Sequence, residues 1–388
     1  MLTGALSEVF SGAPAERVLD RTLRAHRDLS RDQRRVLAEA LFNMSLWRRR
    51  LLFHLGVEAA SGGDLLQVFL SRLVGLPPEE AARLAGGAAL AVSSGEPSSL
   101  AERYSLPDWL AEHFLQEWGP SAEDFCAHLN VPGPITLRTN LLKGSREALQ
   151  ARLQAEGVET RPGALSPLAL HVEGPKPNLY GLTALRDGLF EVQDEGSQGI
   201  GLLVGAQPGE TVLDLCAGAG GKTLQLGADM ANTGRLLAYD PDAGRLDRLF
   251  QRSSRAGLSL VQVLRSPPEG LLVDRVLVDA PCSELGSLRR GPDQRFRLTP
   301  EVLSRWPAVQ RELLARARRL VRPGGRLVYA TCTVNRAENE DVARGFLQEA
   351  SEFQLVPQDG PEGFWVRAPH LHGTDGFFAA VFERRAGG

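Results

Sequence analysis

The residues of this chain that could carry out covalent chemistry are its four cysteines: Cys126, Cys216, Cys282 and Cys332. No two of them form a CxxC pair, so their spacing argues against a structural zinc site, and four in 388 residues argue against a disulfide framework. Cys282 follows the apolar run RVLVD and Cys332 follows RLVYAT, each at the end of an expected strand. These two are candidate nucleophiles facing one cleft. We expect Cys126 to be a core residue and Cys216 to line a turn with its backbone.

A nucleophilic thiolate has a use in methyl transfer to carbon. Carbon 5 of a pyrimidine is a poor nucleophile, but addition of a thiolate to C6 pushes electron density to C5, which can then accept a methyl group. Removal of the C5 proton lets the thiolate leave. Such a site needs a nucleophilic cysteine, an acidic group for the ring nitrogens and a base, and Cys332, Asp279 and Cys282 are candidates for these tasks.

A glycine turn provides a second site. The strand-like run TVLDL leads directly into CAGAGGKT (216–223) and then into an expected helix. Glycines at such a junction let the backbone approach a ligand and aim helix N-terminal amides at it. A second apolar run, RLLAY, ends in Asp240, a little over twenty residues beyond Gly218, where a carboxylate can accept both hydroxyls of a ribose. Turn and carboxylate together predict a nucleoside cofactor.

The type of nucleoside follows from what the turn lacks. Gly221-Lys222-Thr223 resembles the end of a phosphate-binding loop, but a Walker loop needs a glycine where Cys216 stands, which weakens the hypothesis of a P-loop NTPase. The nicotinamide fingerprint is also incomplete, because Thr223 occupies the place of its third glycine. S-adenosylmethionine is the best fit.

The elements that must position these residues predict three domains. Apolar residues recur at helical spacing over 1–115, with Ser30 as an expected N-cap, which predicts a helical bundle. Alternating runs around the helix-like SREALQARLQAEG predict a small α+β domain over 116–196. Short apolar strands alternate with helices over 197–388, which predicts a doubly wound, Rossmann-like α/β domain whose ligands lie at the carboxyl ends of the strands. The tail FWVRAPHLHGTDGFFAAVFERR predicts an antiparallel hairpin at the sheet edge.

The charge distribution indicates a polyanionic partner only locally. The net charge is −3, but ten arginines lie between Arg17 and Arg50, and eleven arginines against four acidic residues lie between Pro281 and Arg326. Several of these, such as Arg311 and Arg319, are equally compatible with a solvated helix face. Lysine occurs only at Lys143, Lys176 and Lys222, so a compact ammonium group is used rarely and in selected places.

Five segments resemble one family, the RNA 5-methylcytosine methyltransferases of the Sun/NOL1/NOP2 type, and most closely its bacterial members that act on 16S rRNA. They are GLFEVQDEGSQ (188–198), VLDLCAGAGGKT (212–223), VLVDAPCSELGSLRRGPD (276–293), YATCTVNRAENEDV (329–342) and TDGFF (374–378). The resemblance covers nearly the whole chain. It implies an N-terminal NusB-like domain, a small RNA-binding domain and a C-terminal methyltransferase domain that uses S-adenosylmethionine.

The resemblance also implies roles for single residues. Cys332 would be the nucleophile that attacks C6, and Cys282 would assist release of the product. Asp279 would lie between the cofactor and the target base, and Lys222 would face the reacting centre. The residues implied in cofactor binding are Cys216, Ala217, Gly218, Ala219, Gly220, Gly221, Lys222, Asp240 and Asp279.

The expected partner is therefore RNA, with rRNA suggested by the resemblance alone. We expect a monomer with no bound metal and no membrane association. The N-terminus MLTGALSEVF has no signal-peptide pattern, which favours a cytoplasmic location. A catalytically weak RNA-binding assembly factor remains an alternative, and a P-loop-type NTPase is a less favoured one.

Overall fold

The computed structural model describes residues 1–266 and 268–387 and divides into two compact units. One unit comprises Met1–Pro132 together with Leu288–Pro300, and the other comprises Gly133–Ser287 together with Glu301–Gly388. The chain of the second unit thus leaves it shortly after Cys282 and returns before Cys332. The domain boundaries after residues 115 and 196 stay predictions.

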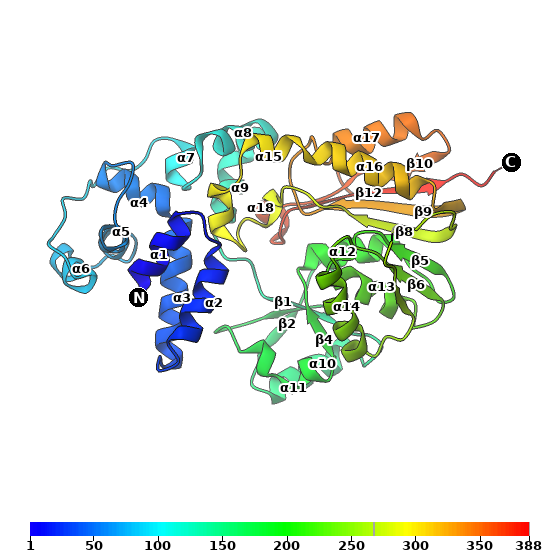
Figure 1. Cartoon of the computed structure of the whole chain (residues 1–388), viewed down its shortest axis with the longest axis horizontal. Helices are drawn as coiled ribbons and strands as arrows, with labels where there is room; N and C mark the ends of the chain where they lie inside the picture. Colours follow the sequence, from blue (N-terminus) through cyan, green and yellow to red (C-terminus); the bar gives the residue numbers. More distant parts are fainter. Residues whose placement is uncertain (267, 388) are drawn as a thin grey trace. The chain divides into compact units, whose positions relative to one another are not determined.

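The first unit is helical, as expected for its sequence pattern (Figure 1). Its helices are α1 (Leu2–Phe10), α2 (Ala15–Ala25), α3 (Arg31–Leu46), α4 (Arg48–Leu55), α5 (Gly62–Val68), α6 (Pro78–Ala85), α7 (Leu100–Arg103), α8 (Asp108–Trp118) and α9 (Ala122–Leu129). Ser30 caps α3 in a reciprocal capping box with Gln33, which confirms the expected N-cap. Among the described residues, none of the helices is long and apolar enough to cross a bilayer.

The segment 288–300 is built into the first unit by polar contacts. Arg295 is fully buried there and donates hydrogen bonds to the Asn130 side chain (2.7 Å) and to the carbonyl of Tyr104 (3.2 Å). The carboxylate of Asp293 accepts the backbone N–H of Ala15 at 3.3 Å. Burial lowers the pKa of Arg295 to about 10. Part of the second arginine-rich stretch is therefore structural.

The second unit begins with a small antiparallel sheet in the order β2-β3-β1-β4. Its strands are β1 (Thr136–Thr139), β2 (Thr160–Pro162), β3 (Ala169–Val172) and β4 (Phe190–Val192). The helices α10 (Arg146–Ala155) and α11 (Thr183–Arg186) bury Leu149, Leu153 and Leu185 in the same core as Leu137 of β1. This arrangement confirms the expected small α+β domain.

The remainder of the second unit forms a large sheet in the order β10-β12-β9-β8-β5-β6-β7, with β11 paired to β12. The strands are β5 (Thr211–Asp214), β6 (Arg235–Ala238), β7 (Val261–Val263), β8 (Val273–Asp279), β9 (Val321–Thr331), β10 (Phe353–Leu355), β11 (Trp365–Arg367) and β12 (Phe377–Arg384). The strands from β7 to β9 are parallel, and β12 runs antiparallel to β9 and to β11. The doubly wound sheet and the antiparallel pairing of β11 with β12 in the tail are confirmed, but the expected position at the sheet edge is wrong, because β10 pairs with the outer side of β12.

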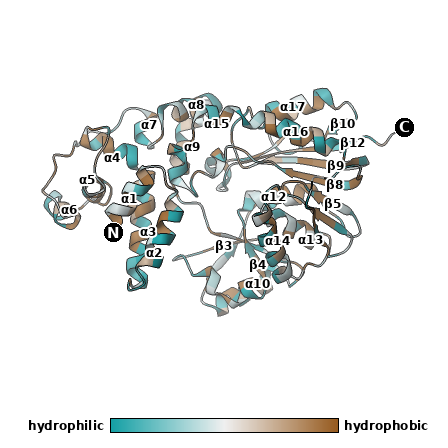
Figure 2. Ribbon diagram, in the orientation of Figure 1, coloured by the Kyte–Doolittle hydropathy of each residue, from teal (hydrophilic) through white to brown (hydrophobic). Residues whose placement is uncertain are grey.

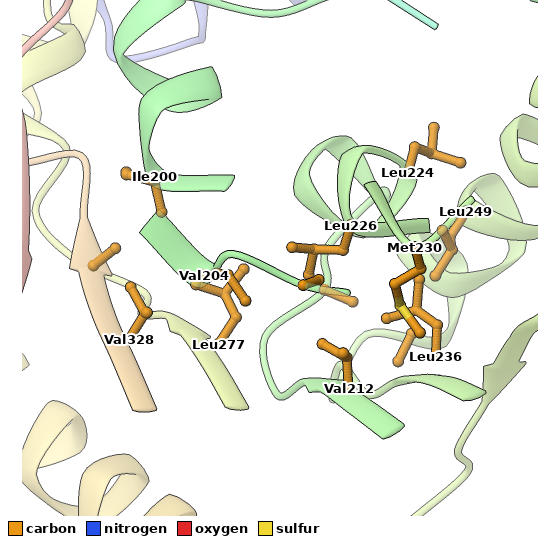
Figure 3. Packing of buried hydrophobic residues seen from close by; sticks show 14 of the residues in the cluster. Ile200, Val204, Val212, Leu224, Leu226, Met230, Leu236, Leu249, Leu277 and Val328 are labelled. Carbon is orange, nitrogen blue, oxygen red and sulfur yellow. The ribbon is translucent and has the colours of Figure 1, made fainter. Parts of the chain in front are cut away.

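Helices cover both faces of this sheet (Figure 1). One face carries α12 (Glu195–Val204), α13 (Gly221–Asp229) and α14 (Ala243–Ala256), and the other carries α16 (Trp306–Arg318) and α17 (Glu340–Glu349). Short helices α15 (Pro300–Ser304) and α18 (Pro369–His372) lie in the connections. Strands β8 and β9 are strongly hydrophobic (Figure 2), as expected for strands buried on both faces. Figure 3 shows one of the two resulting cores.

Candidate active site

The candidate site lies where the strand order reverses. β5 lies between β6 and β8. Helix α14, which follows β6, covers one face of the sheet, and α16, which follows β8, covers the other. In open parallel sheets, ligands bind at this switch point, beyond the carboxyl ends of the strands. Asp214 ends β5 and Asp279 ends β8, while Asp240 follows β6 by two residues. Three carboxylates thus gather at the edge predicted to bind a ligand.

The glycine turn after β5 uses its glycines for different purposes. Gly220 caps α13 in a left-handed conformation (φ +90°), and a Cβ there would lie 2.2 Å from Cδ1 of the buried Leu249. Gly218 is also left-handed (φ +54°), but a Cβ at Gly218 or Gly221 would meet no atom within 4 Å. One side of the turn is therefore packed against the core, and the other leaves open space of the kind a cofactor would fill.

Two carboxylates fix the shape of this turn. Asp240 accepts the N–H of Gly218 at 2.9 Å and the N–H of Asp242 at 2.8 Å. Asp214, which the sequence analysis did not single out, accepts the Thr223 hydroxyl at 2.7 Å. Burial raises the pKa of Asp214 to about 7, although the hydrogen bond from Thr223 opposes that rise. The sequence did contain a signal for Asp214, because it is an acidic residue at the end of an apolar strand. A buried carboxylate at such a position needs a hydrogen-bond donor from a neighbouring residue.

The small sheet supports the same turn from a distance in sequence. Arg138 of β1 is fully buried by its surroundings and donates to the carbonyl of Gly221. Glu191 of β4 pairs with Arg252 at 2.8 Å and Arg255 at 2.5 Å, and Arg252 donates to the carbonyl of Ala219 at 2.7 Å. Two carbonyls of the turn are thus held by arginines, which is a contribution that the sequence pattern did not reveal.

Lys222 connects the turn to the end of β8. Its ammonium group is about nine-tenths buried and lies 2.7 Å from the carboxylate of Asp279. The ring of Phe377, in the TDGFF segment, has its centroid 5.9 Å from the same nitrogen. Lys222 is therefore not a solvated lysine at the start of a helix. A paired cation and anion stand between the turn and the strand that leads to Cys282.

The two candidate thiols meet. Cys282 Sγ lies 3.4 Å from Cys332 Sγ, which confirms the prediction that both emerge at one edge from neighbouring strands. Cys282 is buried, and its hydrogen bond with Cys332, together with burial, raises its pKa well above the ordinary value. Cys332 is partly exposed. Of the two sulfurs, Cys332 is therefore the more accessible to a substrate.

The sequence of this chain matches two protein-family models and several named relatives. A family model described as 16S rRNA methyltransferase RsmB/F matches residues 202–383, and a model described as the RsmF/B-like ferredoxin-like domain matches residues 106–178. A probable ribosomal RNA small subunit methyltransferase B of Synechocystis sp. is 37% identical over 307 residues, which are 74% of this chain and 69% of the relative. This chain belongs to the RsmB/F family of 16S rRNA methyltransferases.

Further relatives agree with this assignment. A probable ribosomal RNA small subunit methyltransferase B of Bacillus subtilis is 32% identical, over 74% of this chain and 68% of the relative. The crystal structure of PH0851 superimposes with a TM-score of 0.81 at 28% identity, over 98% of this chain and 97% of that one. NSun6 from Pyrococcus horikoshii with SFG has a TM-score of 0.67 at 22% identity, over 72% of this chain and 98% of that one, and shows the fold alone.

Membership of the RsmB/F family decides several predictions. The chain is an rRNA methyltransferase that uses S-adenosylmethionine and acts on 16S rRNA. The alternatives of a P-loop-type NTPase and of a catalytically weak assembly factor are set aside. The NusB-like character of the N-terminal helices, the monomeric state and the cytoplasmic location stay predictions.

The other two cysteines of this family member lie where the sequence analysis expected them. Cys126 is fully buried among the helices of the first unit, and burial raises its pKa to about 12. Cys216 lies in the glycine turn after β5, and burial, together with the nearby carboxylates, raises its pKa well above the ordinary value. Neither thiol is suited to act as a nucleophile at neutral pH.

The arginine-rich stretches supply less free charge for binding rRNA than their composition suggested. Arg34 donates to three backbone carbonyls, of Leu23, His26 and Leu29. In the second stretch Arg295 is buried, and Arg318 forms an ion pair with Glu352 at 2.5 Å. Arg311 and Arg319, by contrast, are exposed. Composition could not separate these cases, because an arginine that holds carbonyls and one that faces solvent have the same local sequence signal.

Proposed function

We propose that this RsmB/F-family enzyme methylates carbon 5 of a cytosine in 16S rRNA through a transient covalent bond between Cys332 and C6 of the base. The observation that carries the proposal is the thiol pair, with 3.4 Å between Cys282 Sγ and Cys332 Sγ. Methylation of a ring nitrogen, an exocyclic amine or a ribose oxygen needs no protein nucleophile. A pair of thiols at the switch point is explained by methylation at a carbon that must first be activated.

Accessibility and acidity support a division of labour between the thiols. Cys332 is partly exposed, so its sulfur can reach the face of an inserted base. Cys282 is buried and its pKa is raised well above the ordinary value, first by the hydrogen bond with Cys332 and then by burial, so it stays a protonated thiol. A neutral thiol beside the nucleophile is suited to exchange protons with it and with the base during product release.

The residues around the turn fit S-adenosylmethionine. The open side of Gly218 and Gly221 accommodates a ligand against the backbone, and Asp240 has lone pairs left for ribose hydroxyls. When bound, this cofactor supplies an electrophilic methyl group. Lys222 and Asp279 then lie between the turn and the thiols, where the ion pair can orient the base and offset charge that develops on its ring.

The proposed reaction is an addition followed by an elimination. The Cys332 thiolate forms an S–C6 bond, and the electron pair of the C5–C6 double bond moves to C5, which forms a bond to the methyl group as the bond between that methyl group and the sulfonium sulfur breaks, leaving S-adenosylhomocysteine. A base then removes the C5 proton, the C5–C6 double bond re-forms, and the S–C6 bond breaks to return the thiolate. The target cytosine must be unstacked to reach Cys332, so it is expected in a loop or in RNA that is not fully assembled.

Single substitutions of the two thiols test the proposal. Cys332→Ala should abolish methylation of 16S rRNA and leave no covalent protein–RNA adduct, because no nucleophile remains. Cys282→Ala should transfer one methyl group and then stay joined to RNA through Cys332, visible as co-migration on a denaturing gel. Cys126→Ala, which removes a buried thiol remote in sequence from this site, is the control and should keep its activity.

Two results would contradict this assignment. A Cys332→Ala enzyme with near wild-type turnover would exclude the covalent mechanism, and an adduct trapped by Cys332→Ala would reverse the roles of the two cysteines. Mapping the nucleotide labelled by S-adenosylmethionine in RNA from a strain lacking the enzyme tests the target. Label on any position other than cytosine C5 would overturn the proposal, whatever the thiol variants do.

A further inference from the structure

We propose that Glu338 is a positioning residue that holds the Cys282 loop against the Cys332 loop, so that the two thiols stay close enough for product release. This inference rests on the proposed function. Glu338 belongs to the segment NRAENED (335–341), and no part of the sequence analysis assigned it a task. The residue touches neither thiol directly, and it acts through the residues that follow each of them.

The Glu338 carboxylate is fully buried and accepts four hydrogen bonds. One oxygen, Oε1, accepts from the Ser283 hydroxyl and from Asn335 Nδ2 at 2.9 Å. The other, Oε2, accepts from the Ser283 N–H at 3.0 Å and from Gln310 Nε2 at 2.9 Å. Two of the four donors belong to Ser283, the neighbour of Cys282.

The same carboxylate reaches the neighbour of Cys332 through a hydroxyl. Ser283 Oγ and Thr333 Oγ1 are 2.7 Å apart. Because the Ser283 proton points to Glu338, the Thr333 hydroxyl is the donor in this contact. Residues that directly follow the two cysteines are therefore joined to each other, and the carboxylate sets the direction of the chain of hydrogen bonds.

Contacts from the adjoining residues complete the arrangement. Asn339 accepts the Thr331 hydroxyl at 2.6 Å and donates to the carbonyl of Thr333 at 3.0 Å, so it holds both neighbours of Cys332. Gln310 donates to the carbonyl of Pro281 at 3.0 Å as well as to Glu338. The residues on either side of each cysteine are thus fixed by side chains around Glu338.

A carboxylate is required here because all four partners are donors. Burial of a carboxylate is costly unless hydrogen bonds compensate for lost hydration, and this one is compensated fully. In Glu338→Gln one oxygen becomes an NH₂ group. If this NH₂ group occupies the position of Oε2, it faces two hydrogen-bond donors, the backbone N–H of Ser283 and the amide of Gln310, and the backbone N–H cannot rotate away. If it occupies the position of Oε1, it faces one donor, the amide of Asn335, because the Ser283 hydroxyl can rotate to accept a hydrogen bond.

The substitutions Glu338→Gln and Glu338→Ala should therefore loosen the Cys282 loop in graded fashion. We expect product release to slow by about 10- to 100-fold in Glu338→Ala, and less in Glu338→Gln, because the releasing thiol is displaced from the nucleophile. The covalent protein–RNA adduct should accumulate in both variants, as it should in Cys282→Ala, while the affinity for S-adenosylmethionine stays unchanged. A purely structural role predicts parallel loss of melting temperature and activity with no adduct.

Asp341→Asn is the matched control. Asp341 is an exposed carboxylate three residues beyond Glu338, paired with Arg344 at 2.7 Å. Its loss removes a surface ion pair worth little. We expect this variant to turn over and to release product as the wild-type enzyme does.

A second measurement tests how close the two thiols lie to each other, and it needs neither RNA nor the methylation reaction. Diamide takes one hydrogen from each of two adjacent thiols and is reduced to the hydrazine as the disulfide forms. In the wild-type protein it should join Cys282 to Cys332, detected as a linked peptide pair by mass spectrometry. The rate of linking should fall in Glu338→Ala and be unchanged in Asp341→Asn.

The outcomes separate the inference from the proposed function. If Cys332→Ala retains activity, the proposed function fails whatever Glu338 does. If Cys282→Ala traps an adduct but the Glu338 variants release product and link their thiols at wild-type rates, only the positioning role of Glu338 is overturned. Loss of adduct formation in Glu338→Ala would also overturn it, because the residue would then serve Cys332 rather than Cys282.

Discussion

The glycine turn after β5 is built mostly from residues near one another in the chain, whereas the thiol pair after β8 and β9 joins residues 50 positions apart. Within the turn, Asp214 binds Thr223 nine residues later and Gly218 binds Asp240 twenty-two residues later. The thiols meet only because β8 and β9 pair in parallel. The turn is thus formed by contacts between residues close in the chain, whereas the thiol site depends on the pairing of two strands in the sheet.

The two regions also differ in how they hold charge. Around the turn the carboxylates of Asp214 and Asp240 accept neutral donors, and the cations Arg138 and Arg252 hold carbonyls. Around the thiols the buried carboxylate of Glu338 accepts neutral donors from both cysteine loops, Ser283 after Cys282 and Asn335 after Cys332. Neutral donors orient a loop without introducing a cation that would stabilise the wrong thiolate.

Lys222 links the two regions, because its ion pair with Asp279 joins the glycine turn to the end of β8, and its loss should have the largest effect. Replacing it by alanine removes the ammonium group that lies 2.7 Å from Asp279 and leaves that carboxylate without its partner beside the reacting base. We expect kcat to fall by about 100-fold or more, in the range found when one preorganised charge or donor is removed from an active site. The measurement is steady-state methylation of 16S rRNA, with S-adenosylmethionine affinity determined in parallel.

The exposed Lys143 provides the control for that variant. Lys143→Ala removes the same charge from the surface and should leave kcat unchanged. A Lys222→Ala enzyme that methylates at the wild-type rate would show that the ion pair with Asp279 serves only the packing of the turn.

Alanine substitutions at two adjacent glycines, Gly220 and Gly221, should affect stability differently, because one faces the packed side of the turn and the other faces the open side. Gly220→Ala forces a side chain into a left-handed conformation and against the buried Leu249, so we expect the free energy of unfolding to fall by about 1–3 kcal/mol. Gly221→Ala meets no atom within 4 Å and should leave stability within about 0.5 kcal/mol of the wild type. Urea unfolding measures both.

Binding then distinguishes the two sides. Gly221→Ala should weaken binding of S-adenosylmethionine in calorimetry although its stability is unchanged, because its new methyl group enters the open space. If the affinity stays at the wild-type value, the cofactor does not occupy that space.

A further prediction concerns the pH dependence of stability that follows from the buried carboxylate under the turn. Asp214 has a pKa of about 7 in the folded protein, against an ordinary value of 3.8, so between these values the folded state holds a proton that the unfolded state has lost. Stability therefore declines as pH rises from about 4 to 7, and the loss is complete above 7. Asp214→Asn cannot titrate and keeps an acceptor for Thr223, so its melting temperature should exceed that of the wild type by a margin that grows over this range.

Asp274 gives the opposite sign and serves as the control. Although burial opposes it, hydrogen bonds from Thr211 N–H and Arg322 lower the pKa of Asp274. Asp274→Asn should therefore melt below the wild type at neutral pH, and the difference should shrink as pH falls through the ordinary pKa of a carboxyl group. Equal pH profiles for the two variants would contradict the assignment of the raised pKa to Asp214.

The elements and the turn could be read from the sequence because their signals are local. Period-two and helical apolar patterns predicted the three kinds of architecture, and the CAGAGGKT turn with Asp240 predicted a cofactor site before any tertiary contact was known. The two thiols were found because each follows a strand, and parallel strands end at one edge. The arginine-rich stretches misled, since charge alone does not tell whether Arg295 is solvated or buried.

The sequence by itself therefore determined the order of elements, the glycine turn after β5 and the position of both thiols at strand ends, all of which depend on residues close in the chain or on one regular rule of sheets. Only the tertiary structure decided that Glu338 accepts hydrogen bonds from the loops of both Cys282 and Cys332. It also decided that Arg138 of the small sheet binds a carbonyl of the glycine turn, and that residues 288–300 belong to the same unit as the N-terminal helices. These features join segments far apart in the chain. Their physical reason is the need of buried carboxylates, guanidinium groups and carbonyls for partners, which the packed fold supplies and no local pattern records.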